Sequence, residues 1–146
     1  MFWEKIYKMA TIDMQTMRYI NLLDKASKVK TKQCFIYNNT IFFAVPEELI
    51  SRAIGPAALH VRIMQEHLGK KIRIIREPRE LRDINRFIND LISPGRFKSL
   101  EVKDNCVIVT AGSNQNKAIL IGRNKKRLFE LQKIIQDVYL MDLKII

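Results

Sequence analysis

The sequence predicts an α+β protein made of two copies of one small module. Apolar runs that are typical of strands alternate with stretches whose apolar residues recur at helical spacing. The pair Ile-Gly occurs twice, at Ile54-Gly55 and at Ile121-Gly122, each time between two predicted helices. Because the same order of segments surrounds both pairs, we expect each module to form a three-stranded sheet with helices packed on one face.

The first module is expected to begin with a helix and to end with a basic strand. Tyr19 and Leu23 share one face of that helix, and Asn38-Asn39 favours a hairpin turn because Asn tolerates a positive φ. We expect helices at 12–26, from 46 to about 52 and at 56–68, and strands at 34–37, 40–45 and 71–76. The helix 56–68 should end at a glycine cap and should turn three apolar residues inward: Leu59, Ile63 and Leu68.

The second module repeats this order. We expect helices from 78 to about 91, at 114–120 and from about 125 to 139, and strands at 97–102, 106–111 and 140–146. Ser113 suits the N-cap of the helix 114–120. The helix that starts at 78 should present one apolar face, formed by Leu81, Ile84, Phe87, Ile88 and Leu91.

The two modules align at a nearly constant offset. Asn38-Asn39 corresponds to Asp104-Asn105 at an offset of 66, and Gly55 corresponds to Gly122 at an offset of 67. The final strands correspond at an offset of 71, so the last helix of the second module should be one turn longer. We therefore expect an N-terminal extension at 1–10, a first domain at 11–76 and a second domain at 77–146.

Composition limits the classes of function. The net charge of +11 favours a polyanionic partner such as RNA, DNA or an anionic membrane surface. No apolar run has the length of a membrane span, and the N-terminus does not fit a signal peptide, so we expect a soluble cytoplasmic protein without a membrane partner. Cys34 and Cys106 lack metal-ligand spacing, and no catalytic motif occurs. We expect no enzyme activity, no cofactor and no metal site.

The order of elements, with Ile-Gly between two helices, resembles the KH domain in its type II arrangement. Two tandem copies, with the run Met17-Arg18-Tyr19-Ile20-Asn21 in the first helix, resemble the archaeal form of the transcription factor NusA. The resemblance implies two KH type II domains, each with a three-stranded mixed sheet. It also implies a monomeric protein that binds single-stranded RNA during transcription elongation, termination or antitermination. The RNA would be a nascent transcript or rRNA, and RNA polymerase is a further expected partner.

The family motif is Ile-Gly-x-x-Gly with at least one basic x, which holds the RNA backbone against N–H groups at a helix start. In the second module the implied RNA-binding residues are Ile121, Gly122, Arg123, Asn124, Lys125 and Lys126. In the first module they are Ile54, Gly55, Pro56, Ala57 and Ala58, with Arg62, Lys71 and Arg73 guiding the RNA backbone. Lys125 and Ala58 stand where the motif has its second glycine. Since the first loop also lacks basic residues, we expect the second loop to be the working clamp.

Two other functions remain open. The chain could be a ribosome- or rRNA-associated KH protein, for which the same RNA chemistry is expected. It could also be a protein-interaction adaptor whose KH loops no longer bind RNA, which the altered first loop favours.

Overall fold

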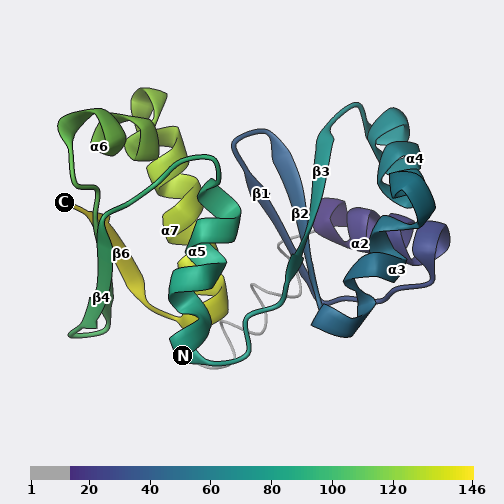
Figure 1. Ribbon diagram of the computed structural model, residues 1–146, viewed down its shortest axis with the longest axis horizontal. Helices are drawn as coiled ribbons and strands as arrows, with labels where there is room; N and C mark the ends of the chain where they lie inside the picture. The colour runs from purple at the N-terminus through teal and green to yellow at the C-terminus, as the bar shows by residue number, and fades with distance from the viewer. Residues whose placement is uncertain (1–13) are drawn as a thin grey trace. The chain divides into compact units, whose positions relative to one another are not determined.

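The computed structural model describes residues 14–146 and forms two compact α+β units (Figure 1). The first unit contains the described residues up to Phe35 together with Ile41–Glu77, and the second contains Ile36–Thr40 and Pro78–Ile146. The expected extension at 1–10 and the expected start of the first helix at residue 12 lie outside the described residues. The α+β class and the two three-stranded sheets are confirmed.

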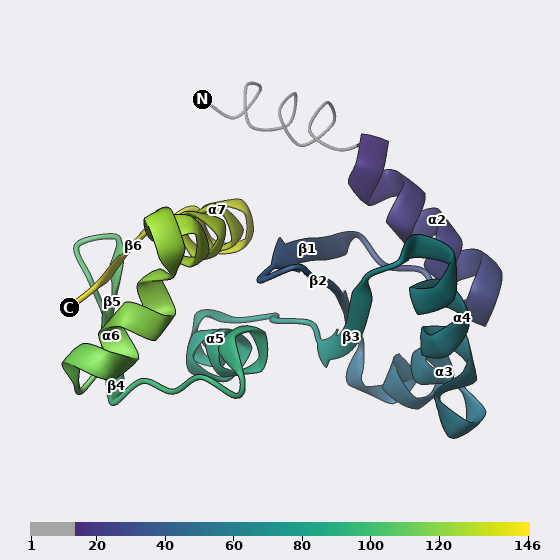
Figure 2. The ribbon, with the colours of Figure 1, turned by 90° about the horizontal axis from the view of Figure 1, so that it is seen from above.

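The first unit, taken together with the hairpin tip Ile36–Thr40 that is grouped with the second unit, has the element order helix, strand, strand, helix, helix, strand. Its elements are α2 (Met14–Ser27), β1 (Gln33–Tyr37), β2 (Thr40–Val45), α3 (Ile50–Ile54), α4 (Leu59–Leu68) and β3 (Lys71–Arg76), with 3-10 turns at Glu47–Leu49 and Pro56–Ala58. The sheet order is β1-β2-β3, so the strand that precedes α3 is central. Figure 2 shows α2, α3 and α4 together on one face of this sheet.

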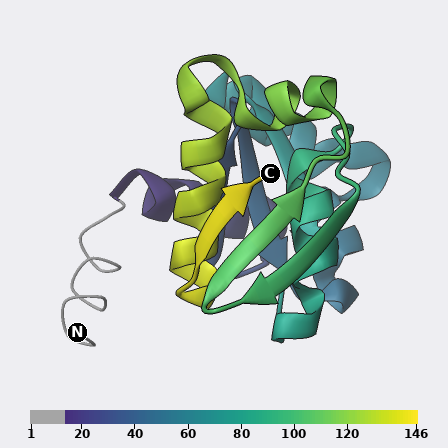
Figure 3. The ribbon, with the colours of Figure 1, turned by 90° about the vertical axis from the view of Figure 1, so that its left-hand side faces the viewer.

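The second unit repeats the order. Its elements are α5 (Ile84–Ile92), β4 (Ser99–Lys103), β5 (Cys106–Thr110), α6 (Asn114–Ile121), α7 (Lys126–Tyr139) and β6 (Asp142–Ile145), with 3-10 turns at Leu81–Asp83 and Arg123–Lys125. β4 and β5 are antiparallel, whereas β5 and β6 are parallel, with Val107 opposite Leu143. Figure 3 shows this sheet in front of its helices. A parallel pair needs a crossover connection, and α6, α7 and the loop between them form it.

The burial of the strands shows where the two cores lie. In β5, Val107 and Val109 are buried while Cys106, Ile108 and Thr110 are half-buried, as expected for a strand with one face on the core. In β2 every residue is buried. Met64 of α4 and Leu131 of α7 complete the two cores from the helix side.

Two parts of the predicted apolar faces are wrong. Leu59 and Ile63 are exposed although both lie in α4, and the inward face of this helix runs through Val61, Met64 and Leu68 instead. Leu81 is exposed as well, because it lies in a 3-10 turn that precedes α5. The rest of that predicted face is confirmed by the buried side chains of Ile84, Phe87, Ile88 and Leu91.

The last turn of α7 is held against α5 inside the second unit. The Tyr139 ring meets the Phe87 ring edge-on, with centroids 6.3 Å apart, and its hydroxyl donates to the Glu80 carbonyl over 3.1 Å. Burial, together with the nearby Asp83 carboxylate, raises the pKa of Tyr139 to about 12. The hydroxyl therefore stays protonated and remains a hydrogen-bond donor at neutral pH.

A reciprocal cap closes the start of the 3-10 turn Leu81–Asp83 that leads into α5. The sequence placed the start of this helix too early, at 78. One carboxylate oxygen of Asp83 accepts from the backbone N–H groups of Arg79 and Glu80, each over 3.0 Å. The Glu80 side chain accepts a backbone N–H of the first turn in return. The N–H groups of Arg79 and then Glu80 hold the pKa of Asp83 below its usual value.

We expect Asp83→Asn to lower the thermal midpoint at neutral pH, because the charged acceptor of the cap is removed. Since the folded pKa is lowered, the stabilisation is complete above the unfolded pKa, near about 3.9, and disappears as the pH falls through the folded value. Asp104→Asn is the matched control: it removes the same charge from a hairpin turn at positive φ. Thermal unfolding at neutral pH and in strong acid checks this. A deficit of equal size at both pH values would contradict it.

Candidate nucleic-acid interface

The two Ile-Gly loops have the same backbone conformation. Gly55 has φ 81° and ψ 169°, and Gly122 has φ 75° and ψ 173°, a region that essentially only glycine adopts. In each loop the second and third residues after the glycine are left-handed, at φ between 53° and 59°. These residues are Ala57 and Ala58 in the first unit and Asn124 and Lys125 in the second. The following helix starts only after them.

A side chain from the following helix crosses each glycine. His60 Nδ1 lies 2.9 Å from the Arg52 carbonyl oxygen and donates to it, and Arg127 Nη1 donates to the Ile119 carbonyl over 3.1 Å. We call His60 and Arg127 the crossing side chains. Each follows its glycine by five residues and bonds to the carbonyl of the residue three positions before that glycine. They pass so close that a Cβ on Gly55 would lie 2.6 Å from the imidazole, and one on Gly122 would lie 2.8 Å from Arg127 Cγ. Each glycine is therefore required for both its φ and its lack of a side chain.

The surfaces of the two loops differ although their backbones agree. Arg123, Asn124, Lys125 and Lys126 are all exposed, while Ile121 and Gly122 are half-buried behind them. In the first loop Pro56 and Ala57 are exposed, and Ile54, Gly55 and Ala58 are half-buried. The second loop thus presents three cations at a helix start, and the first loop presents none. Pro56 also lacks the N–H that Arg123 has at the same place.

The other residues predicted to guide RNA in the first unit do not gather at Gly55. Arg62 is exposed on α4, in the second turn after the loop. Lys71 follows the Gly69 cap, at the opposite end of α4, which is about 15 Å long. The Arg73 guanidinium lies over the Phe42 ring, 5.6 Å from its centroid. Only Arg62 is therefore placed near the loop.

The contacts of the crossing side chains and the exposure of Leu59 and Ile63 were not predicted from the sequence. The signal for the crossing side chains was present, since His60 and Arg127 correspond at the same offset of 67 as the two glycines. A histidine and an arginine can both take this role because the contact needs only an N–H donor of sufficient reach. Arg127 therefore positions the loop, in addition to adding charge.

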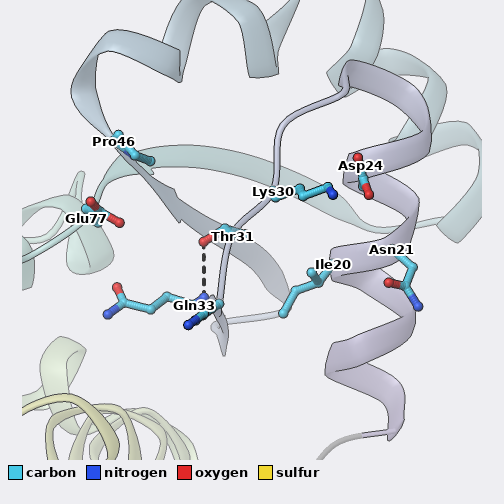
Figure 4. Close-up of a pocket in the computed structure, with 9 residues that line it drawn as sticks. Ile20, Asn21, Asp24, Lys30, Thr31, Gln33, Pro46 and Glu77 are labelled. Carbon is cyan, nitrogen blue, oxygen red and sulfur yellow. Dashed lines mark hydrogen bonds between the residues drawn. The ribbon is translucent and has the colours of Figure 1, made fainter.

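A pocket of about 620 Å³ lies elsewhere in the first unit (Figure 4). It is bounded by α2, by the segment that leads into β1, and by Pro46 and Glu77. Thr31 Oγ1 accepts the Gln33 N–H over 3.1 Å at its edge. Its lining pairs two acids, Asp24 and Glu77, with two lysines. This balance of charge does not favour a polyanion as the ligand of the pocket.

Comparison with solved structures identifies the same fold in another protein. The chain is similar to the crystal structure of APE1850. The TM-score is 0.63 with 21% sequence identity, over 91% of this chain and 99% of that chain. The similarity extends through both units, and at this identity it shows the fold alone. No protein-family model matches the chain, and no curated protein matches it.

The described part of the chain offers neither a metal centre nor a membrane span. Between residues 14 and 146, no group of three or more His, Cys, Asp or Glu side chains could hold a metal ion. None of the helices formed by these residues is long and apolar enough to cross a membrane.

We expect Gly55→Ala to destabilise the first unit by about 1–3 kcal/mol for its φ alone, with a further cost because the new methyl group meets the His60 ring. Gly69→Ala is the matched control: Gly69 also has a positive φ, but no atom lies within 4 Å of the added Cβ. Urea unfolding of both variants measures the difference. Equal destabilisation by the two substitutions would contradict the importance of the crossing contact.

Proposed function

We propose that the chain consists of two tandem KH type II domains and binds single-stranded RNA through the Gly122 loop. Its role is that of a NusA-like factor in transcription elongation, termination or antitermination. The element order of each unit and the central position of β2 and β5 support the KH assignment. The observation that carries the RNA assignment is the Gly122 loop. Gly122 has a conformation that essentially only glycine adopts, and the side chains of Arg123, Lys125 and Lys126 beside it are exposed.

The chemistry of this loop suits a phosphate. The N–H groups at a helix start point outward and carry a partial positive charge. Arg123, Lys125 and Lys126 add full charges at the same place, although cations at a helix N-terminus are locally unfavourable by a few tenths of a kcal/mol each. Residues that oppose a local preference are expected where a ligand compensates for them. In the proposed complex, a phosphate of the RNA takes that place.

The first loop has a different proposed role. It has the same backbone but no charge, and Pro56 removes one N–H, so it contributes little to phosphate binding. The exposed pair Leu59 and Ile63 on α4, at 41% and 46% exposure, is suited to apolar contacts with bases or with a protein. This pair is also what favours the alternative of a protein-interaction adaptor.

We expect Arg123→Ala with Lys125→Ala to weaken binding of a short single-stranded RNA and to reduce its salt dependence. The slope of log K against log salt should fall by about 0.7 for each phosphate that the variant no longer neutralises. Lys103→Ala with Lys144→Ala is the matched control, since it removes two exposed cations from strands of the same unit. Fluorescence anisotropy over a range of salt concentrations measures both. Equal slopes in the two double variants would contradict the assignment of the Gly122 loop as the phosphate-binding site. If the wild type did not bind RNA at low salt, the alternative of a protein-interaction adaptor would be favoured.

We expect Lys125→Gly to stabilise the protein and to weaken RNA binding at the same time. A left-handed non-glycine residue costs about 1–2 kcal/mol. Glycine removes this cost but adds about 0.5–1 kcal/mol of backbone entropy, so the net gain in stability is up to about 1.5 kcal/mol. Ala58→Gly, at the corresponding left-handed position, should give the same gain without a change in RNA affinity. Unfolding and RNA titration of both variants separate the two effects. A loss of RNA affinity in Ala58→Gly would show that both loops contribute to RNA binding.

The cellular process is tested separately from RNA binding. Affinity purification of the full chain should recover RNA polymerase and nascent transcripts. Recovery of ribosomal particles instead would replace the transcription assignment with the rRNA-associated alternative.

A further inference from the structure

Phe129 is an aromatic side chain that the fold does not bury. It is 57% exposed on α7, whereas Phe42, Phe43 and Phe87 are buried in the cores. Single exposed apolar residues are common on protein surfaces, so its meaning depends on what surrounds it.

The neighbours of Phe129 on the helix surface are cations. Residues three and four apart lie side by side on a helix, which places Lys126 before Phe129 and Lys133 after it. Lys125 is the left-handed residue that immediately precedes α7. All three lysines are exposed or half-buried at the protein surface. The ring therefore borders the basic surface that begins at the Gly122 loop, about 4.5 Å along the helix axis from Lys126.

Comparison of the two units shows that the fold does not require a phenyl ring here. At the offset of 67 that relates the two glycines, Phe129 corresponds to Arg62, which is also exposed. The same backbone position thus accepts a long cation in one unit and an aromatic ring in the other. The ring is therefore a feature of the second unit, the one whose loop carries the exposed cations.

We propose that Phe129 is a stacking platform for one unpaired base of an RNA whose phosphate is held at the Gly122 loop. This inference rests on the proposed function, since it takes the phosphate position from there. An aromatic face among cations is the combination by which proteins hold single strands: the cations follow the backbone and the ring stacks on a base. Because every base has a π-face, this contact adds affinity with little sequence preference.

The surroundings favour a nucleobase over a protein as the occupant. A protein interface needs a continuous apolar surface around its aromatic anchor. Around Phe129, α7 presents Lys126, Glu130 and Lys133. A single ring bordered by charges is large enough for one base and too small for an apolar interface.

Two oligonucleotides of equal length test the proposal: a short single-stranded RNA and an abasic strand that has phosphates but no bases. We expect Phe129→Leu to weaken binding of the RNA by about 5- to 150-fold and to leave binding of the abasic strand unchanged. Phe129→Trp should retain the affinity for RNA. Val102→Ala is the control: Val102 is 37% exposed on β4, near the turn that contacts Leu140 at the far end of α7.

A second readout reports the stacking directly. Trp3 is the single tryptophan of the chain, so Phe129→Trp in a Trp3→Phe background carries one fluorophore at the proposed platform. Its emission should be quenched by the RNA and not by the abasic strand at saturation.

The outcomes separate this inference from the proposed function. If Phe129→Leu binds RNA as the wild type does, or loses affinity for both strands equally, the stacking platform is overturned while RNA binding stands. If the wild type binds neither strand at low salt, the proposed function fails and the platform fails with it. Quenching of the introduced tryptophan by the abasic strand to the same extent would also overturn base stacking.

Discussion

In each unit, the turn between the two helices depends on one glycine that is crossed by a side chain from the second helix. Gly55 and Gly122 end α3 and α6 in a conformation that other residues rarely adopt, and they leave room for His60 and Arg127 to reach back to a carbonyl. This contact joins two successive helices across a sharp turn. The crossover between the parallel strands of the second unit passes through this turn. The position of the exposed loop residues follows from it.

The same backbone supports two different surfaces. The first loop is small and apolar, and the second is cationic, yet their φ and ψ values agree closely. The backbone is therefore determined by the glycine, the crossing side chain and the packing of the helices. The residues between them can differ, and they differ in charge. This separation explains why a repeated fold carries two proposed roles.

Several elements of this fold could be predicted because their signals are local. The apolar face of α5 was predicted at four of its five positions, since helical spacing identifies such a face directly. The prediction for α4 was wrong at Leu59 and Ile63, because helical spacing permits two apolar faces and packing buries the face of Met64. The left-handed conformation of Ala57 and Ala58 before this helix was not predicted either. Alanine has no sequence signal for that conformation. The glycine turn and the exposed cations of the Gly122 loop could be predicted from the motif, but the exposed ring of Phe129 could not.

The sequence by itself determined the number of modules, the order of their elements, the two glycine turns and the excess of positive charge. These properties depend on spacing and composition, which are read along the chain. The tertiary structure decided which residues are left-handed, which side chain crosses each glycine and which apolar residues remain exposed. These depend on contacts between segments that lie apart in the chain, such as Arg127 with the Ile119 carbonyl. Periodicity within one segment carries no information about such contacts.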